Sequence, residues 1–138
     1  MARYMFDSGT CAAIMKRSSE PLLQRLQQIS LADVCMSVIA RAELLYGVEV
    51  SADRARDAAA LAAFLPYIAT VEFSNDAELH YAEIRADLRR RRLKLGSNDM
   101  LIAAHARSLG LTLVTGKVAE FVRVQDLALE NWTAARSR

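Results

Sequence analysis

Short apolar runs alternate with longer helical stretches along this chain, and this alternation restricts its possible folds more than any other feature. Five short runs are typical of buried strands, at residues 3–6, 34–36, 70–73, 112–114 and 127–132. Six longer stretches predict helices, at residues 10–16, 20–29, 38–50, 54–66, 77–93 and 99–109. Because strands separated by helical crossovers pair in parallel, the pattern predicts an α/β fold with a parallel sheet.

Helix-starting and helix-ending residues stand at several of the predicted borders. Ser37 precedes one helix, and Asn75 or Asp76 precedes another, as N-cap residues do. Gly110 follows the helix at 99–109, where a C-terminal glycine is expected. These residues support the proposed order of elements.

The composition predicts a compact domain without disulfides. The chain has 138 residues, of which 53% are hydrophobic, enough to bury one continuous core. Cys11 and Cys35 lie in apolar surroundings, so we expect buried free thiols and no need for an oxidising compartment. We find no leader-like segment and no apolar run of membrane-spanning length, and therefore expect a cytoplasmic protein without a membrane partner.

Three acidic residues are placed so that the predicted fold can bring them together. Asp7 ends the first strand, Glu43 lies inside the helix at 38–50, and Asp99 begins an apolar helix. Two carboxylates about 4 Å apart repel by roughly 4 kcal/mol at an effective dielectric constant of 20, so converging acids favour a divalent cation between them. Oxygen ligands without Cys or His indicate magnesium, with manganese as a substitute, rather than zinc. The pattern predicts a metal-dependent site that cuts phosphodiester bonds.

Each acid also has a simpler interpretation. Asp7 can merely cap the following helix, and Asp99 can be an ordinary first-turn acid next to a capping Ser97 or Asn98. Glu43 has no Lys or Arg three or four residues ahead to pair with. Its carboxylate must therefore find a partner across the fold or bind metal.

A basic run forms the only strong charge asymmetry in the sequence. Between Arg85 and Lys94 there are six cations and one acid, a local balance of +5, whereas the net charge of the chain is only +2. Because this run leads directly to Asp99, we expect it to bind phosphates, although a solvated helix face is the alternative. His80 and His105 are expected to be structural, since nothing predicts two converging imidazoles.

In this order and spacing, the motifs resemble the PIN-domain ribonucleases, and among them the VapC toxins of bacterial toxin–antitoxin pairs. The resemblance rests on residues 4–7, 37–49, 81–88, 96–106, 113–115, 120–121 and 129–132. It implies that residues 1–138 form a single PIN domain, with a central parallel sheet flanked by helices on both sides. It also implies a structured RNA substrate such as tRNA, a VapB-type antitoxin whose C-terminal tail covers the site, and a homodimer.

The resemblance further assigns residues to roles. The metal ligands and catalytic acids would be Asp7, Glu43 and Asp99. The supporting polar residues would be Ser8, Asn98, Thr115 and Glu120. The residues expected to hold the RNA backbone, partly from the basic run, are Arg85, Arg89, Arg90, Arg92, Lys94 and Lys117.

Two positions depart from the family pattern. Gly9 stands where an Asn is usual, and Gly116-Lys117 stands where an Asn or Asp usually completes the polar site; Glu120 is a candidate for the missing charge. Lys117 can neutralise the acids or point outward to an RNA phosphate, and we expect the outward position.

These departures leave rival interpretations. One is a catalytically weakened PIN module that acts mainly by binding RNA or an antitoxin. A phosphatase of the haloacid dehalogenase type is disfavoured, because Gly9 stands where its second acid is needed. The alanine-rich segment 55–63 is expected to serve helix packing, or to present a flat apolar face to a partner.

Overall fold

The computed structural model describes residues 2–134 of the chain. Two short 3₁₀ helices, Leu31–Asp33 and Leu65–Tyr67, accompany the main elements. In chain order these main elements are β1 (Tyr4–Phe6), α1 (Ser8–Lys16), α2 (Glu20–Leu26), β2 (Val34–Ser37), α3 (Val38–Glu49), α4 (Arg54–Phe64), β3 (Ala69–Val71), α5 (Asn75–Arg90), α6 (Ser97–Ser108), β4 (Thr112–Val114), α7 (Val118–Phe121) and β5 (Leu129–Glu130).

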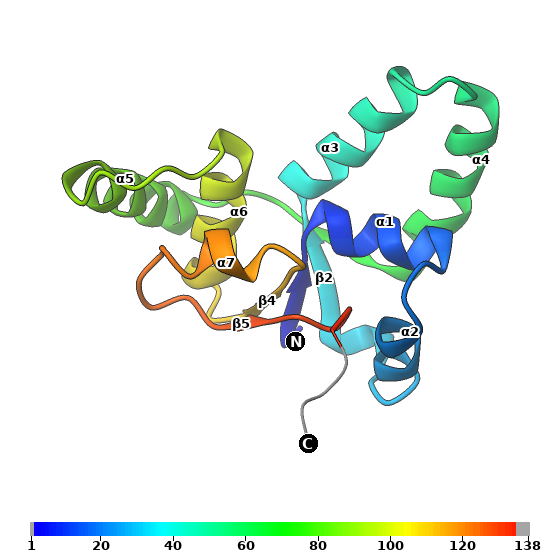
Figure 1. The fold of residues 1–138 in the computed structure, drawn as a ribbon, viewed down its shortest axis with the longest axis horizontal. Coiled ribbons are helices and arrows are strands. Elements are labelled where there is room, and N and C mark those ends of the chain that lie inside the picture. Colours follow the sequence, from blue (N-terminus) through cyan, green and yellow to red (C-terminus); the bar gives the residue numbers. More distant parts are fainter. Residues whose placement is uncertain (1, 135–138) are drawn as a thin grey trace.

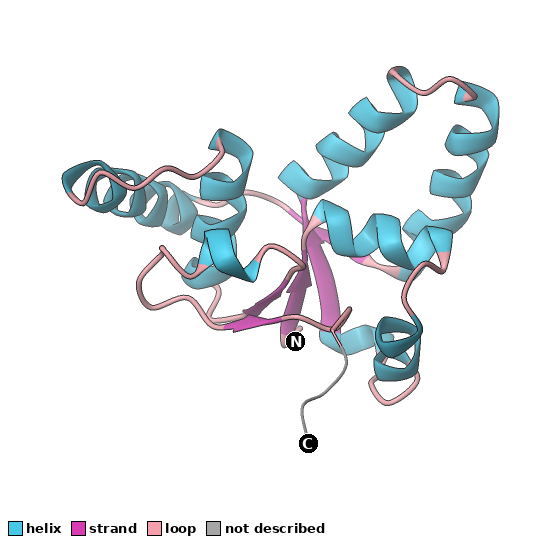
Figure 2. Ribbon diagram, viewed as in Figure 1, coloured by secondary structure: helices cyan, strands magenta, loops and turns pink. Residues whose placement is uncertain are grey.

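The strands form one five-stranded parallel sheet with the order β3-β2-β1-β4-β5. Helices cover both of its faces, as an all-parallel sheet requires (Figures 1 and 2). Helices α3 and α4 form a hairpin that projects beyond the sheet on one side, and α5 with α6 packs on the other (Figure 1). The predicted fold class is confirmed.

The core is built from the central strands and from the one helix that is apolar nearly all round. Met5 and Phe6 of β1 and Leu113 and Val114 of β4 are fully buried. The middle of α6, residues 102–106, is also fully buried, because this helix lies between the sheet and α5. The indole of Trp132 closes one end of the core, with edge-to-face contacts to the rings of Tyr4 and Phe6 at 4.9 and 5.3 Å.

Several element borders differ from the predicted ones. Ser74, not Asn75 or Asp76, caps α5, since its hydroxyl accepts from the backbone N–H of Ala77. Helix α6 begins after Gly96 without a side-chain cap, so neither Ser97 nor Asn98 is its N-cap. Helix α7 has no counterpart in the predicted elements, because its single turn is too short to show a period. Gly110 is confirmed as the glycine after α6, with a φ of +67°.

Candidate active site

The carboxyl ends of β1 and β4 meet at the point where the strand order reverses. Strands β2 and β3 lie on one side of β1, and β4 and β5 lie on the other. Open parallel sheets bind ligands at such a switch point. The backbone N–H of Asp7 donates to the carbonyl of Val114 at 3.2 Å, and the hydroxyl of Thr10 donates to the same carbonyl at 3.0 Å. The two strand ends are therefore joined directly.

Asp7 is buried at this junction, and its side chain is 3% exposed. One carboxylate oxygen, Oδ1, accepts from the backbone N–H of Thr10 at 2.8 Å, so Asp7 is the N-cap of α1. The other, Oδ2, accepts from the hydroxyl of Thr115 at 2.6 Å. Both donors hold the carboxylate in one orientation and offset the cost of its burial. Asp7 therefore serves both as the N-cap of α1 and as a residue of the candidate site.

Glu43 reaches the junction from the middle of α3. Ser37, the last residue of β2, caps this helix by accepting from the backbone N–H of Ile39 at 3.0 Å. Because α3 starts at the carboxyl end of β2, its Glu43 lies near α1, where the hydroxyl of Ser8 donates to Oε1 at 3.1 Å. Glu43 was expected to find a partner elsewhere in the fold, and that partner is the neutral hydroxyl of Ser8.

Asp99 comes from the first turn of α6, which runs antiparallel to the strands and so begins at their carboxyl ends. Its Oδ2 lies 3.2 Å from Nζ of Lys117, which follows β4. The predicted outward position of Lys117 is therefore wrong: its side chain lies against Asp99. The family pattern places a neutral or acidic side chain there. The neutralising position, which was the alternative, is the one found, because an unpaired acid attracts a nearby ammonium group.

Lys117 also shows that the three acids share one neighbourhood. Partial burial lowers the pKa of Lys117. Its hydrogen bond with Asp99 raises that pKa, as do the charges of Asp99, Asp7 and Glu43, and the pKa ends above its ordinary value. Across residues 2–134, however, no three Asp, Glu, His or Cys side chains lie close enough to hold one metal ion as they stand.

Comparison with known proteins fits this arrangement. The PIN domain family matches residues 4–126. The tRNA(fMet)-specific endonuclease VapC of Salmonella typhimurium is 33% identical over 132 residues, covering 96% of this chain and 99% of the relative. Ribonuclease VapC2 of Haemophilus influenzae is 37% identical with the same coverage. The chain belongs to the PIN-domain family, among the VapC proteins.

Solved VapC-containing structures share the fold of this PIN domain. The DNA-bound VapBC complex from Salmonella typhimurium matches with a TM-score of 0.90 and 32% identity, over 96% of this chain and 99% of that one. VapBC2 from Rickettsia felis, bound to a promoter DNA fragment, matches with a TM-score of 0.86 and 33% identity, over 94% and 98%. The resemblance found in the sequence is confirmed.

All six cations of the basic run of this PIN domain are exposed. Arg89 and Arg90 end α5, and Arg92 and Lys94 lie in the loop that leads to α6 (Figure 1). Arg85 donates to the hydroxyl of Tyr81 at 2.8 Å. The end of α5 and the start of this loop are therefore rich in exposed positive charge.

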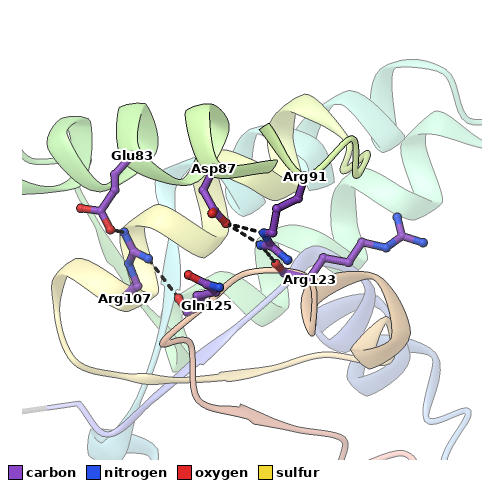
Figure 3. A network of polar contacts seen from close by, with 6 residues as sticks. All are labelled: Glu83, Asp87, Arg91, Arg107, Arg123 and Gln125. Carbon is purple, nitrogen blue, oxygen red and sulfur yellow. Dashed lines mark hydrogen bonds and ion pairs between the residues drawn. The ribbon is translucent and has the colours of Figure 1, made fainter. Parts of the chain in front are cut away.

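Arg91, which was not among the predicted RNA-binding residues, belongs to a polar network that ties α5 to the loop after α7 (Figure 3). It pairs with Asp87 and donates to the carbonyl of Arg123. In the same network Arg107 pairs with Glu83 at 3.0 Å. These contacts fix the far end of α5 against the rest of the PIN domain.

The remaining predicted residues have more peripheral positions. Asn98 and Glu120 are exposed, in the first turn of α6 and in α7.

His105 is fully buried in α6, and its Nδ1 lies 2.9 Å from the hydroxyl of Ser37, while its Nε2 has no hydrogen-bond partner among the described residues. This contact joins α6 to the start of α3. Thr10 is the residue that the sequence analysis missed; its position three residues after a capping Asp was the available signal.

Proposed function

We propose that this VapC-family chain is a magnesium-dependent endoribonuclease, the toxin of a VapBC-type toxin–antitoxin pair. The carrying observation is a set of contacts at the carboxyl ends of the sheet. Thr115 donates to Asp7, and Lys117, whose backbone N–H donates to Thr115, contacts Asp99 with its side chain. Ser8, the neighbour of Asp7, donates to Glu43. The relatives named as ribonucleases and as a tRNA(fMet)-specific endonuclease support RNA as the substrate. We therefore place structured RNA, tRNA included, as the substrate class, and the cytoplasm as the place of action.

The residues present fit a hard divalent ion in their chemistry. The acids offer oxygen donors only, as magnesium prefers, and manganese would substitute. Asp7 and Asp99 would hold the ion, with Glu43 as a direct ligand, as a ligand through water, or as the residue that orients the attacking water. When bound, the ion would polarise the scissile phosphate and activate that water for in-line attack.

The protein supplies orientation and charge around that chemistry. Thr10 and Thr115 fix the carboxylate of Asp7, and Ser8 fixes that of Glu43. The exposed cations Arg89, Arg90, Arg92 and Lys94 would hold the RNA backbone without reading its sequence, with Arg85 at the edge of this patch. Single-stranded loops of a structured RNA offer the unstacked geometry that such a site can reach.

Incubation with cellular RNA tests this function. The purified chain is expected to cut RNA in magnesium or manganese and to stop in EDTA. Asp99→Asn in the same buffers controls for a contaminating nuclease. Cleavage that continues unchanged in EDTA, or in the Asp99→Asn protein, would rule out the proposed site.

The weakened-module alternative keeps one observation in its favour, which is the pairing of Lys117 with Asp99. If that pair holds the site closed, the chain would bind RNA or antitoxin without cutting. RNA binding together with an absence of cleavage at every magnesium and manganese concentration would establish this alternative.

An apolar groove between α1, α3 and α4 is the proposed position of a VapB-type antitoxin segment. It has a volume of about 240 Å³ and includes Met15 of α1, Leu44 and Val48 of α3, and Ala60 and Leu61 of α4. The solved neighbours are VapBC complexes, which supports such a partner. Ala60 is exposed, so Ala60→Trp should fill the groove and weaken co-purification with the antitoxin while leaving RNA cleavage unchanged.

Two further features remain proposals about the whole chain. We treat residues 1–138 as a single PIN domain and expect a homodimer. The part of the chain that the structure describes has no helix long and apolar enough to cross a membrane. Light scattering of the purified protein, alone and with its antitoxin, tests the expected dimer.

A further inference from the structure

One cation of the chain already lies among the proposed metal ligands. Nζ of Lys117 is 3.2 Å from Oδ2 of Asp99, and the side chain of Asp99 is only 16% exposed. The other two acids are held by neutral donors, Thr10 and Thr115 on Asp7 and Ser8 on Glu43. Among residues 2–134, Lys117 is therefore the one cation that contacts this group of carboxylates.

The backbone of Lys117 is tied to the same site. Its N–H donates to the hydroxyl oxygen of Thr115 at 2.9 Å, and that hydroxyl donates to Asp7 at 2.6 Å. The backbone of Lys117 is thus connected to Asp7 through Thr115, and its side chain reaches a second acid, Asp99. Its flexible stem is the part that can move, because its side chain is 54% exposed.

A single ammonium group balances only part of the charge of three acids. The remaining negative charge still attracts a divalent ion. Such an ion must take Asp99 away from its present partner, and it would suffer repulsion from an ammonium group that stayed in place.

We propose that Lys117 is a built-in counter-cation of the carboxylate site, so that a divalent ion binds only by displacing its ammonium group from Asp99. This inference rests on the proposed metal-dependent function and adds a condition to it. Lys117 would stabilise the metal-free protein and raise the metal concentration at which the site fills. Once displaced, its side chain becomes free to move toward solvent.

Metal titration of two variants tests the proposal. Lys117→Met keeps the length of the stem and removes the charge, whereas Lys117→Arg keeps the charge. Lys16→Met is the matched control, since Lys16 is exposed at the far end of α1. Manganese binding, followed by calorimetry and by the magnetic resonance signal of the free ion, should tighten about three- to tenfold in Lys117→Met alone.

A second readout needs no activity. In EDTA, Lys117→Met should unfold at a lower temperature than the unmodified chain. Saturating manganese should raise the midpoint of thermal unfolding more in Lys117→Met than in the unmodified chain. A merely structural lysine would lower the midpoint equally with and without metal. Equal manganese affinity in Lys117→Met and the unmodified chain would overturn the counter-cation while leaving the metal-dependent function standing. A failure of every protein to bind manganese would overturn both.

Discussion

Thr115 and Asp7, which lie 108 positions apart in the chain, are joined by a hydrogen bond of 2.6 Å from the threonine hydroxyl to Oδ2 of the aspartate. Each residue directly follows one of two neighbouring parallel strands. The bond therefore fixes the relative position of two strand ends and, at the same time, the direction of a buried carboxylate. It links the stability of the sheet to the geometry of the candidate active site.

Replacing Thr115 should therefore affect stability. Thr115→Val keeps the volume but deprives Asp7 of a donor and the backbone N–H of Lys117 of its acceptor. We expect the free energy of unfolding to fall by about 1–3 kcal/mol, the usual cost of a buried polar group left unpaired. Thr115→Ser keeps the hydroxyl and should lose much less. Urea unfolding measures these changes. An unchanged free energy of unfolding in Thr115→Val would show that the hydrogen bond does not contribute to stability.

Conservative replacement of Glu43 and of Asp99 should remove activity and spare the fold. A metal contributes several kcal/mol to transition-state stabilisation, so Glu43→Gln and Asp99→Asn should each slow cleavage about 100-fold or more. Asp99→Asn should lower the free energy of unfolding by about 1 kcal/mol or less, because the ion pair that it removes, with Lys117, is partly exposed. Cleavage assays and thermal unfolding measure both effects. Wild-type cleavage by Glu43→Gln would leave Glu43 as a structural acid.

The order of the strands and of the longer helices could be predicted because each of these elements carries its own period or apolar run, which the single turn of α7 does not. The position of Asp7 and Asp99 at the same edge of the sheet was also predictable, since this edge is where the carboxyl ends of parallel strands lie. The partners of these side chains were not. The bond from Ser8 to Glu43 joins residues 35 positions apart, and the pairing of Lys117 with Asp99 depends on the exact direction of a loop. Such contacts depend on how distant segments pack against each other, and local sequence patterns do not predict this packing.

The exposed cations at the end of α5 and directly after it should determine how RNA binding depends on salt. Changing Arg89, Arg90 and Arg92 to Ala should weaken binding and reduce the log–log salt slope by about one unit for each lost phosphate contact. Arg54→Ala with Arg56→Ala is the control, because these exposed arginines lie on α4, where Arg54 pairs with Glu49 of α3 and Arg56 with Asp57. Binding measured in calcium, at several salt concentrations, tests this. If the salt slope equals that of the control, the basic run does not contact RNA phosphates and is only a solvent-exposed helix face.

The buried His105 should make the protein sensitive to mild acid. Burial lowers the pKa of His105 below its ordinary value of 6.5, although the backbone of Glu72 acts in the opposite direction. The unfolded chain therefore takes up this proton before the folded one, and stability falls as the pH drops below about 6.5. Between pH 7.5 and 5.5, the unmodified chain should lose more unfolding free energy than His105→Gln. Parallel pH profiles would contradict this.

The chemical ends of the cut RNA test the central claim most directly. A water activated at a metal site attacks the phosphorus and leaves a linear phosphate, whereas a metal-independent attack by the ribose 2′-hydroxyl leaves a 2′,3′-cyclic phosphate. Mass spectrometry of the fragments produced in magnesium distinguishes the two. We predict linear phosphates and free 3′-hydroxyls, with no products in EDTA. Fragments ending in 2′,3′-cyclic phosphate would contradict a metal-dependent hydrolysis at Asp7, Glu43 and Asp99.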